Sequence, residues 1–338
     1  MVTIYEKILE LEQMPSFSKH DQFVNGIINA INESIVSKGE ALPSVNTMVK
    51  KLSFARATIM KGYKDLISRG IVQSKNRLGF YVANENTDQT LKVALVMYLM
   101  DSFQEQFYRS FRDELGANVQ IDVFFHHGNI TIFESIIDMV KGKYGMYVVS
   151  PIPHPRTQHL LDPLPRNKFI MFDRFEPLSE EFNYVTQEFE NASYEAFSAL
   201  AEKIKLYDEM IFFHLPGSLN PLEIIRAFKK FVKDFDINAR MLPEYIPGSV
   251  EQGKVYFSLN NAEIWEILKD CKVKKLKPGR DIGILSHNDE VIKELIGGGI
   301  TTYSTDFVQM GKRVGQAIIR REQIQEIIPT VLKRRDSL

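Results

Sequence analysis

The residues of this 338-residue sequence that most clearly suggest a chemistry are basic, and they gather near the N-terminus. Between Lys19 and Ala83, ten Lys and Arg side chains stand against four Asp and Glu side chains, a local net charge of +6. The rest of the chain carries a net charge of −7. A small basic segment joined to a larger acidic one is typical of proteins that bind nucleic acid. The charge balance alone is equally consistent with the solvated surface of an ordinary domain.

The position of Arg56 at the start of a predicted helix favours DNA binding. An arginine there can donate two hydrogen bonds to O6 and N7 of guanine, and Thr58 can contact a phosphate or a thymine methyl group. A surface salt bridge would explain a lone arginine better, but a basic hairpin follows in the sequence. The candidate DNA-contacting residues are Ser44, Arg56, Thr58, Lys61, Lys75 and Arg77.

A set of short helices and a hairpin must position these side chains. Apolar residues at helical spacing predict helices over 4–13, 21–37 and 55–68, and another that begins after Ser44, whose hydroxyl can cap it. Two predicted strands, 71–74 and 79–82, enclose a basic turn. This order predicts a winged helix-turn-helix domain over residues 1–83. The polar stretch over residues 84–90 predicts a linker.

From residue 91 to 338 the pattern changes to apolar strands that alternate with amphipathic helices. Strands are predicted over 93–99, 119–125, 146–149, 169–172, 210–213, 255–259 and 282–285. Helices are predicted over 103–115, 130–141, 192–204, 221–235, 262–271 and 289–295. This alternation predicts an α/β fold, either one large or two linked doubly wound parallel sheets covered by helices. Ligands of such sheets bind at the carboxyl ends of the strands.

Polar side chains at those strand ends suggest a site for a polyhydroxylated ligand. A buried polar group without a hydrogen bond costs roughly 1–3 kcal/mol, so such a site must supply paired donors and acceptors. The C–H face of a sugar also packs on aromatic rings. Asp173 as acceptor and Arg174 as forked donor are the strongest pair, although they could instead form a structural ion pair, and each asparagine could cap a loop. The candidates are Phe103, Ser150, Asp173, Arg174, Ser218, Asn220, Asn260, Asn288 and Phe307.

The run LPSVNTMVKKLSFARATIMKGYKDLISRGIV, followed by KNRLGFYV, resembles the gluconate-repressor (GntR) family of winged-helix regulators over about 60 residues. The residues in register are Pro43, Ser44, Leu52, Arg56, Thr58, Leu66, Gly70, Gly79 and Val82. Val45, Ala55 and Met60 depart from the family pattern. The arginine that the family has at the position of Met60 is missing, which implies a different operator sequence while DNA binding itself is retained.

From about Leu91 onward the chain is similar to the effector domain of the lactose-repressor (LacI) type, which is related to periplasmic sugar-binding proteins. KFIMFDRFE and GGGITTYSTDFVQMGKRVGQAI carry most of the similarity. A GntR-type head on a LacI-type body is the arrangement of the arabinose-repressor subgroup, which controls sugar-use genes. The resemblance implies that the ligand-lining positions are Ser150, Asp173, Ser218, Asn220, Asn260, Asn288 and Phe307. It also implies a pentose or 6-deoxyhexose effector, such as L-arabinose or L-fucose.

Together these observations predict a homodimeric cytoplasmic repressor that binds double-stranded operator DNA and releases it when a monosaccharide binds. The alternative is an enzyme of sugar metabolism that carries a DNA-binding head. Such an enzyme would need phosphate-binding glycines or a lysine-centred cofactor pocket, and the sequence displays neither pattern. We therefore expect no enzymatic activity and no cofactor.

Other chemistry is disfavoured by the sequence. The histidines at 126, 127, 154 and 159 lack partners at the short spacing that a metal ion requires. Cys271 is the single cysteine, so no internal disulfide is expected. Acidic residues interrupt the first 13 residues, which argues against a signal peptide. No stretch approaches the roughly 18 apolar residues of a membrane span.

Overall fold

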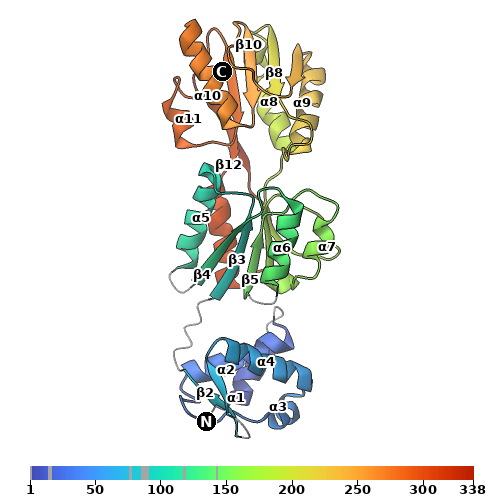
Figure 1. Ribbon diagram of the computed structural model, residues 1–338, viewed down its shortest axis with the longest axis vertical. Coiled ribbons are helices and arrows are strands. Elements are labelled where there is room, and N and C mark those ends of the chain that lie inside the picture. The colour runs from blue at the N-terminus through green and yellow to red at the C-terminus, as the bar shows by residue number, and fades with distance from the viewer. Residues whose placement is uncertain (1, 14–16, 76–77, 85–90, 117–118, 142–143) are drawn as a thin grey trace. The chain divides into compact units, whose positions relative to one another are not determined.

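The computed structural model describes residues 2–13, 17–75, 78–84, 91–116, 119–141 and 144–338 (Figure 1). The chain divides into two compact units. Unit 1 contains residues 1–92 together with 117–120, and unit 2 contains residues 93–116 and 121–338. Within the described ranges, no helix has both the length and the apolar character needed to cross a bilayer.

Unit 1 has the predicted order of helices followed by a hairpin. Its elements are α1 (Ile4–Glu10), a 3-10 turn (Leu11–Gln13), α2 (Lys19–Asn32), α3 (Val45–Leu52), α4 (Arg56–Ser68), β1 (Val72–Lys75) and β2 (Gly79–Val82). The two strands pair antiparallel. The buried ring of Tyr63 in α4 stacks on Phe80 of β2, with 3.9 Å between ring centroids, and its hydroxyl donates to Pro43 O. This side chain therefore joins α4 both to the hairpin and to the segment that leads into α3.

The helix boundaries in unit 1 follow from local capping. The helix predicted over 21–37 instead spans Lys19–Asn32. It begins earlier because Ser18 Oγ accepts a hydrogen bond from Asp21 N at 3.2 Å. It ends earlier because Ser34 adopts a left-handed conformation with φ of 57°. The break between α3 and α4 likewise has Ser53 at φ 56°, so a left-handed residue turns the chain from one helix to the next.

Unit 2 contains two six-stranded sheets, which define lobe A and lobe B (Figure 1). The sheet of lobe A has the order β13-β7-β6-β5-β3-β4, and that of lobe B the order β14-β12-β11-β10-β8-β9. The lobe A strands are β3 (Leu91–Met97), β4 (Val119–Phe125), β5 (Met146–Val149), β6 (Phe169–Asp173), β7 (Asn183–Thr186) and β13 (Gln325–Ile327). The lobe B strands are β8 (Glu209–Phe213), β9 (Ala239–Leu242), β10 (Lys254–Ser258), β11 (Gly283–His287), β12 (Thr301–Thr305) and β14 (Thr330–Lys333). Apart from the antiparallel pair of β12 and β14, the strand pairs whose register is defined run parallel.

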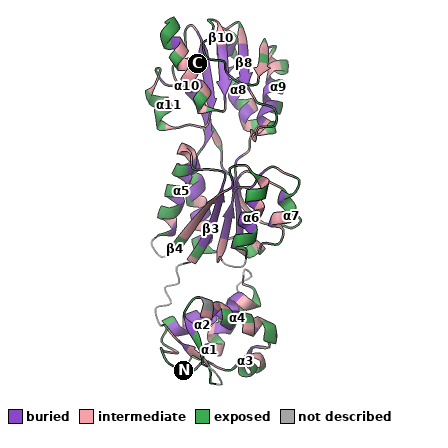
Figure 2. Cartoon of the chain, in the orientation of Figure 1, coloured by how far each residue is buried: buried purple, intermediate pink, exposed green. Residues whose placement is uncertain are grey.

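Helices cover both sheets, and the buried residues lie between helices and strands (Figure 2). Lobe A has α5 (Ser102–Leu115), α6 (Ile130–Val140), α7 (Thr157–Leu161), a 3-10 turn (Arg166–Lys168) and α12 (Phe307–Arg320). Lobe B has α8 (Glu190–Ile204), α9 (Leu222–Phe235), α10 (Asn261–Lys274) and α11 (Val291–Leu295). The chain passes between the lobes after β7, after β12 and after β13. The α/β fold with doubly wound parallel sheets in two lobes is confirmed.

Five strands and one long helix were not among the elements predicted from the apolar pattern. They are β7, β9, β12, β13, β14 and α12. The five strands are short and contain polar residues, and β12 reads Thr-Thr-Tyr-Ser-Thr although every residue in it is buried. A search for continuous apolar runs therefore passes over them, while it finds the seven apolar strands to within about two residues.

Candidate functional site

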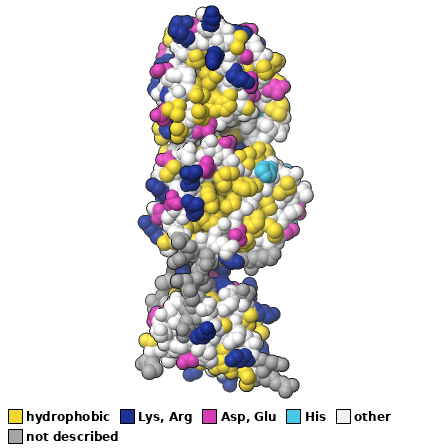
Figure 3. Space-filling view, turned by 60° about the vertical axis from the view of Figure 1, so that its left-hand side comes forward, with side chains coloured by type: hydrophobic (Ala, Val, Ile, Leu, Met, Phe, Trp, Pro, Cys, Tyr) yellow, Lys and Arg dark blue, Asp and Glu magenta, His cyan; other side chains and the backbone are white. Residues whose placement is uncertain are grey.

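The first turn of α4 in unit 1 is open to solvent. Ala55 precedes the helix and provides no side-chain hydrogen bond to it, so the initial backbone N–H groups keep the partial positive charge of a helix N-terminus. Arg56 and Lys61 are exposed and Thr58 is half-buried. The three α4 residues predicted to contact DNA thus come from one solvent-accessible helix, and Lys and Arg side chains stand on the surface of unit 1 (Figure 3).

Arg56 also connects the two helices of the helix-turn-helix. Its Nη1 donates to Asn46 Oδ1 at the start of α3. Asn46 is neutral, and among the described residues Arg56 has no salt bridge, so its positive charge is not compensated. The salt bridge that would explain a lone arginine is therefore not what the structure displays.

The remaining predicted DNA contacts have different surroundings. Ser44 is exposed and caps α3 as predicted: its Oγ accepts from Thr47 N at 3.2 Å and lies 2.8 Å from Thr47 Oγ1. Its hydroxyl is therefore already used by the helix. Lys75, at the end of β1, is exposed, with its Nζ 4.4 Å from the ring centroid of Tyr81. Arg77 lies outside the described residues.

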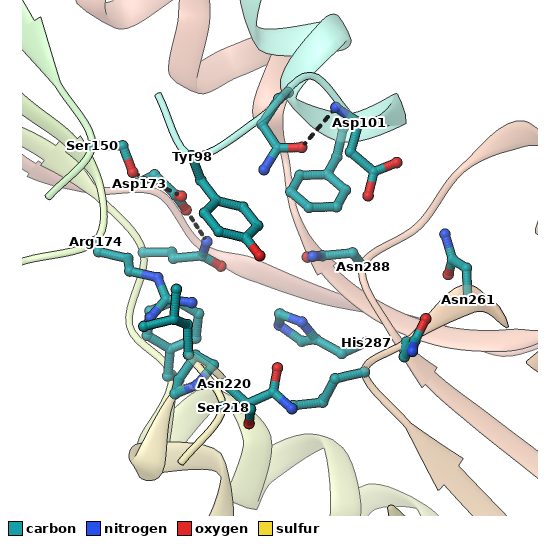
Figure 4. Close-up of a pocket in the computed structure, with 18 of the residues that line it drawn as sticks. Tyr98, Asp101, Ser150, Asp173, Arg174, Ser218, Asn220, Asn261, His287 and Asn288 are labelled. Carbon is teal, nitrogen blue, oxygen red and sulfur yellow. Dashed lines mark hydrogen bonds between the residues drawn. The ribbon is translucent and has the colours of Figure 1, made fainter. Parts of the chain in front are cut away.

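Unit 2 contains a cavity of about 780 Å³ at the carboxyl ends of its strands (Figure 4). Both sheets contribute to its lining. Tyr98, Ser150 and Arg174 follow strands of lobe A, whereas Asn260 and Asn288 follow strands of lobe B. Eight of the nine predicted effector-binding residues line it: Phe103, Ser150, Asp173, Arg174, Ser218, Asn220, Asn260 and Asn288.

Phe307 does not line the cavity. It is buried at the start of α12, and its ring packs behind Phe103, with 4.9 Å between ring centroids. Of this pair, only Phe103 lines the cavity. The expectation that Phe307 contacts the ligand is thus corrected, because its side chain is buried against Phe103 and is not part of the cavity lining.

Asp173 is held by amide and hydroxyl donors rather than by Arg174. Gln187 Nε2 donates to Asp173 Oδ1 at 2.5 Å, and Ser150 Oγ donates to Oδ2 at 3.4 Å. The guanidinium of Arg174 lies over the Phe189 ring, 5.9 Å from its centroid. Burial raises the pKa of Asp173, although the positive charge of Arg174 opposes that shift. The structure therefore leaves the Arg174 donors available to a ligand, and no Asp173–Arg174 ion pair is found among the described residues.

Two polar atoms at the cavity are buried without a hydrogen-bond partner in the described structure, Ser218 Oγ and Asn288 Oδ1. Asn288 also has a left-handed backbone, with φ of 60°. The backbone carbonyl oxygen of Asn288 accepts a hydrogen bond from Lys293 Nζ at 2.8 Å, which stabilises this strained loop. Asn260, in contrast, caps α10 through Oδ1, which accepts from Ala262 N at 3.0 Å. The loop-cap alternative is thus observed for Asn260, while Asn288 and Ser218 retain unsatisfied groups that a polar ligand would satisfy.

Several lining residues were missed from the sequence: Tyr98, Asp101, His126, Gln187, Trp265 and His287. Gln187 matters most, because it connects the cavity to the segments between the lobes. Its Oε1 accepts from Thr305 Oγ1 at 3.0 Å, and Thr305 Oγ1 lies 3.0 Å from Thr330 Oγ1. These three residues belong to the three passages of the chain between the lobes. The only available signal for Gln187 was its place after β7, a strand that the apolar pattern did not reveal.

His126 has a defined tautomer at the edge of the cavity. Its Nε2 lies 3.2 Å from Ser150 O and must donate to it, while Nδ1 accepts from Gly128 N at 3.1 Å. Burial lowers the pKa of His126 to about 4, and the hydrogen bond to Ser150 only partly offsets this. Protonation of Nδ1 would remove the acceptor for Gly128 N–H. His126 is therefore a neutral structural side chain at neutral pH.

Replacement of His126 by glutamine is expected to reduce the acid sensitivity of unit 2. The unfolded histidine titrates near pH 6.5 and the folded one near 4, so between these values the unfolded chain binds more protons and stability falls as pH falls. This one group contributes a slope of about 1.4 kcal/mol per pH unit, which glutamine removes. Urea unfolding between about pH 7 and 5 measures the slope. The control is His127→Gln at the exposed neighbour, and equal slopes in the two variants would contradict the assignment.

The described residues contain no group of three or more His, Cys, Asp or Glu side chains that could hold a metal ion. Cys271 is buried in α10, where burial raises the pKa of its thiol to about 11. Cys271 is therefore a core side chain rather than a reactive thiolate.

Comparison with known proteins gives separate matches for the two units. Residues 20–82 match the family model described as bacterial regulatory proteins, gntR family. An HTH-type transcriptional regulator of Mycobacterium tuberculosis (Rv1152) is 26% identical over 80 residues, which are 23% of this chain and 66% of that regulator. Part of this chain thus spans about two-thirds of that relative's length.

The structural matches cover most of the chain. A LacI family transcriptional regulator from Silicibacter pomeroyi matches with a TM-score of 0.61 at 17% identity, over 73% of this chain and 98% of its own. A LacI family regulator from Enterococcus faecium, solved with bound ribose, matches with a TM-score of 0.59 at 14% identity, over 73% of this chain and 98% of its own. At these identities the matches establish a shared fold.

Proposed function

We propose that this chain, which joins a gntR-family helix-turn-helix to a body with the LacI-type fold, is a cytoplasmic transcriptional repressor that a monosaccharide releases from operator DNA. The relatives named above are regulators, in agreement with the expectation that the chain is not an enzyme. The domain limits proposed are 1–83 for DNA binding, 84–90 for the linker and 91–338 for effector binding and dimerisation.

The observation that carries the proposal is the cavity of unit 2. Its lining presents hydroxyl, amide, carboxylate and guanidinium groups from two lobes, and Ser218 Oγ and Asn288 Oδ1 are buried there without partners. A ligand with many hydroxyl groups supplies both donors and acceptors to such a surface. Phe103 and Trp265 add aromatic faces for the apolar side of a sugar ring. A pentose or 6-deoxyhexose such as L-arabinose or L-fucose is the effector class we propose.

A hydrogen-bonded route from the cavity to all three passages between the lobes supports a regulatory role. A ligand that bonds to Asp173 competes with Gln187 for the same carboxylate, and Gln187 also holds Thr305, which lies next to Thr330. Ligand binding is therefore expected to change the relation of the two lobes. If that change alters DNA affinity, DNA must alter sugar affinity by the same factor.

A homodimer is part of the proposal, because one helix-turn-helix reads only a half-site and binds weakly. Two copies spanning a palindromic operator would give the required affinity. Sedimentation velocity of the full chain, free and with operator, tests this point. A monomer under both conditions would contradict it.

The decisive experiment measures operator affinity with and without free sugars. Selection from random DNA would provide the operator, and fluorescence anisotropy would provide its dissociation constant. A cognate monosaccharide is expected to weaken binding by about 5- to 150-fold. Trp265 is the only tryptophan and lines the cavity, so its fluorescence should follow the same titration.

Asp173→Asn should lose the sugar response while keeping operator binding. Asp113→Asn, at an exposed position of α5, is the matched control and should behave as the unmodified protein. Tighter operator binding in the presence of sugar would contradict release. A sugar response that survives in Asp173→Asn would contradict the assignment of the cavity.

A further inference from the structure

The ionisable side chains around the cavity are mostly acidic. Four carboxylates line it, from Asp101, Asp173, Glu263 and Glu290, against one guanidinium, from Arg174. Burial lowers the pKa of both lining histidines, His126 and His287, so neither adds positive charge near neutral pH. Asp173 is buried and Glu263 is half-buried, and this burial raises the pKa of both carboxyl groups. The cavity therefore has a deficit of positive charge.

The buried lysine beside the cavity offsets part of this negative charge but offers no hydrogen-bond donor to a ligand. Lys293 is only 1% exposed. Its Nζ donates to Ser286 Oγ at 2.9 Å, to His287 O at 3.2 Å and to Asn288 O at 2.8 Å. An ammonium group has three N–H donors, so all of them are used within the protein. Lys293 thus fixes the loop after β11 and has no donor left for a ligand.

Helix N-termini are common phosphate-binding sites, and those of α5, α8 and α10 are already occupied by side chains of this chain, whereas α9 begins after Pro221 of the cavity lining without a side-chain cap. Glu188 accepts hydrogen bonds from the backbone N–H groups of Glu190, Asn191 and Ala192 at the start of α8, at 2.8, 3.0 and 2.9 Å. Asp101 Oδ1 accepts from Ser102 N at 2.8 Å at the start of α5. At α10 the cap is Asn260. At these three helices an incoming anion would have to displace the caps, two of which are themselves negatively charged.

We propose that the cavity selects an uncharged polyhydroxylated ligand and rejects the phosphorylated or carboxylated form of the same compound. This inference deepens the proposed function, since it defines the chemical class of the effector of that site. The physical reason is that a phosphate group brings about two negative charges into a cavity whose described lining has four carboxylates and one guanidinium, with the Lys293 ammonium beside it already hydrogen-bonded within the protein. An uncharged polyol can accept from Arg174 and donate to the carboxylates without that repulsion.

The test uses the full-length protein and the fluorescence of Trp265, since this tryptophan reports on the cavity and not on the basic surface of unit 1. Inorganic phosphate is the first probe, compared with chloride at equal ionic strength. Free sugars paired with their phosphates follow, such as D-ribose with D-ribose 5-phosphate and D-glucose with D-glucose 6-phosphate. Phosphate is expected to leave the fluorescence unchanged. Any sugar that binds should bind at least about 100-fold more tightly than its phosphate.

The outcomes separate this inference from the proposed function. A fluorescence change with phosphate that disappears in Arg174→Gln would overturn phosphate rejection, as would a sugar phosphate that binds more tightly than the free sugar. Either result would leave sugar-regulated DNA binding intact. If no sugar changed the fluorescence while phosphate remained without effect, the monosaccharide effector would fail and anion rejection would stand.

Discussion

Replacing Gly311 with alanine is expected to lower the free energy of unfolding of unit 2 by about 3 kcal/mol. Gly311 lies in α12 where this helix crosses α5. A Cβ atom there would lie 2.4 Å from Phe107 O, 3.0 Å from Phe111 N and 2.2 Å from Ser110 Oγ. Two of these atoms belong to the α5 backbone, so rotation of a side chain cannot relieve the contact. The helices must separate, and the core on both sides of them loses packing.

Urea unfolding followed by Trp265 fluorescence and circular dichroism measures this loss. Lys312→Ala is the control, since it places alanine at an exposed position of the same helix, where its Cβ meets no neighbouring helix. The control should remain within about 0.5 kcal/mol of the unmodified protein. Equal stability of Gly311→Ala and Lys312→Ala would show that α5 and α12 do not pack as described.

Replacing Arg56 with alanine is expected to weaken operator binding by about 10- to 100-fold, because a bidentate contact to guanine is worth about 1–3 kcal/mol. The loss should be largest for the selected operator and should relax the base preference at one position. Lys61→Ala has a different expected signature, namely a similar loss on all sequences and a salt dependence reduced by about one charge. Titrations at several salt concentrations against operator and unrelated DNA distinguish the two.

Lys272→Ala is the control for charge, since it removes one positive charge from an exposed position of α10 in unit 2. It should leave operator affinity unchanged. If Arg56→Ala weakened operator and unrelated DNA by the same factor, Arg56 would contact the phosphate backbone rather than a base. If it weakened neither, α4 would not be the recognition helix.

The elements of unit 1 could be predicted because their signals are local. Ser44 caps α3 by accepting a hydrogen bond from the backbone N–H of Thr47, three residues later. The helical spacing of apolar side chains places Ile59 and Tyr63 of α4 in the core. The helix predicted over 21–37 was too long at its C-terminal end, also for a local reason. The left-handed residue that ends it is Ser34 rather than a glycine, so the sequence gives no signal for the turn. The hydrogen bond from Arg56 to Asn46, across the turn between two helices, was not predictable from spacing.

Most of the predicted cavity residues were correct, but the hydrogen-bond partners of these residues were not predicted. Strand ends indicated seven of its residues, because parallel strands bring their carboxyl ends to one edge, and Phe103 of α5 was predicted as an aromatic surface. The alternative to ligand contact for Asp173 was an ion pair with Arg174, the next residue, whereas the structure provides Gln187 from the end of the neighbouring strand. Phe307 was predicted to contact the ligand, but it is buried in the core, where its ring packs against Phe103.

The sequence by itself determined the basic head, the α/β class and the strand ends that bear polar groups, since charge, periodicity and capping act between near neighbours in the chain. Tertiary structure alone decided which polar residues are buried and with what partner. In β12 Thr302 Oγ1 donates to Asp289 Oδ1 at 2.7 Å, and Tyr303 Oη accepts from Ser193 at 3.1 Å. A polar strand becomes a core strand because residues distant in the sequence satisfy its hydroxyl groups, and no local pattern encodes those partners.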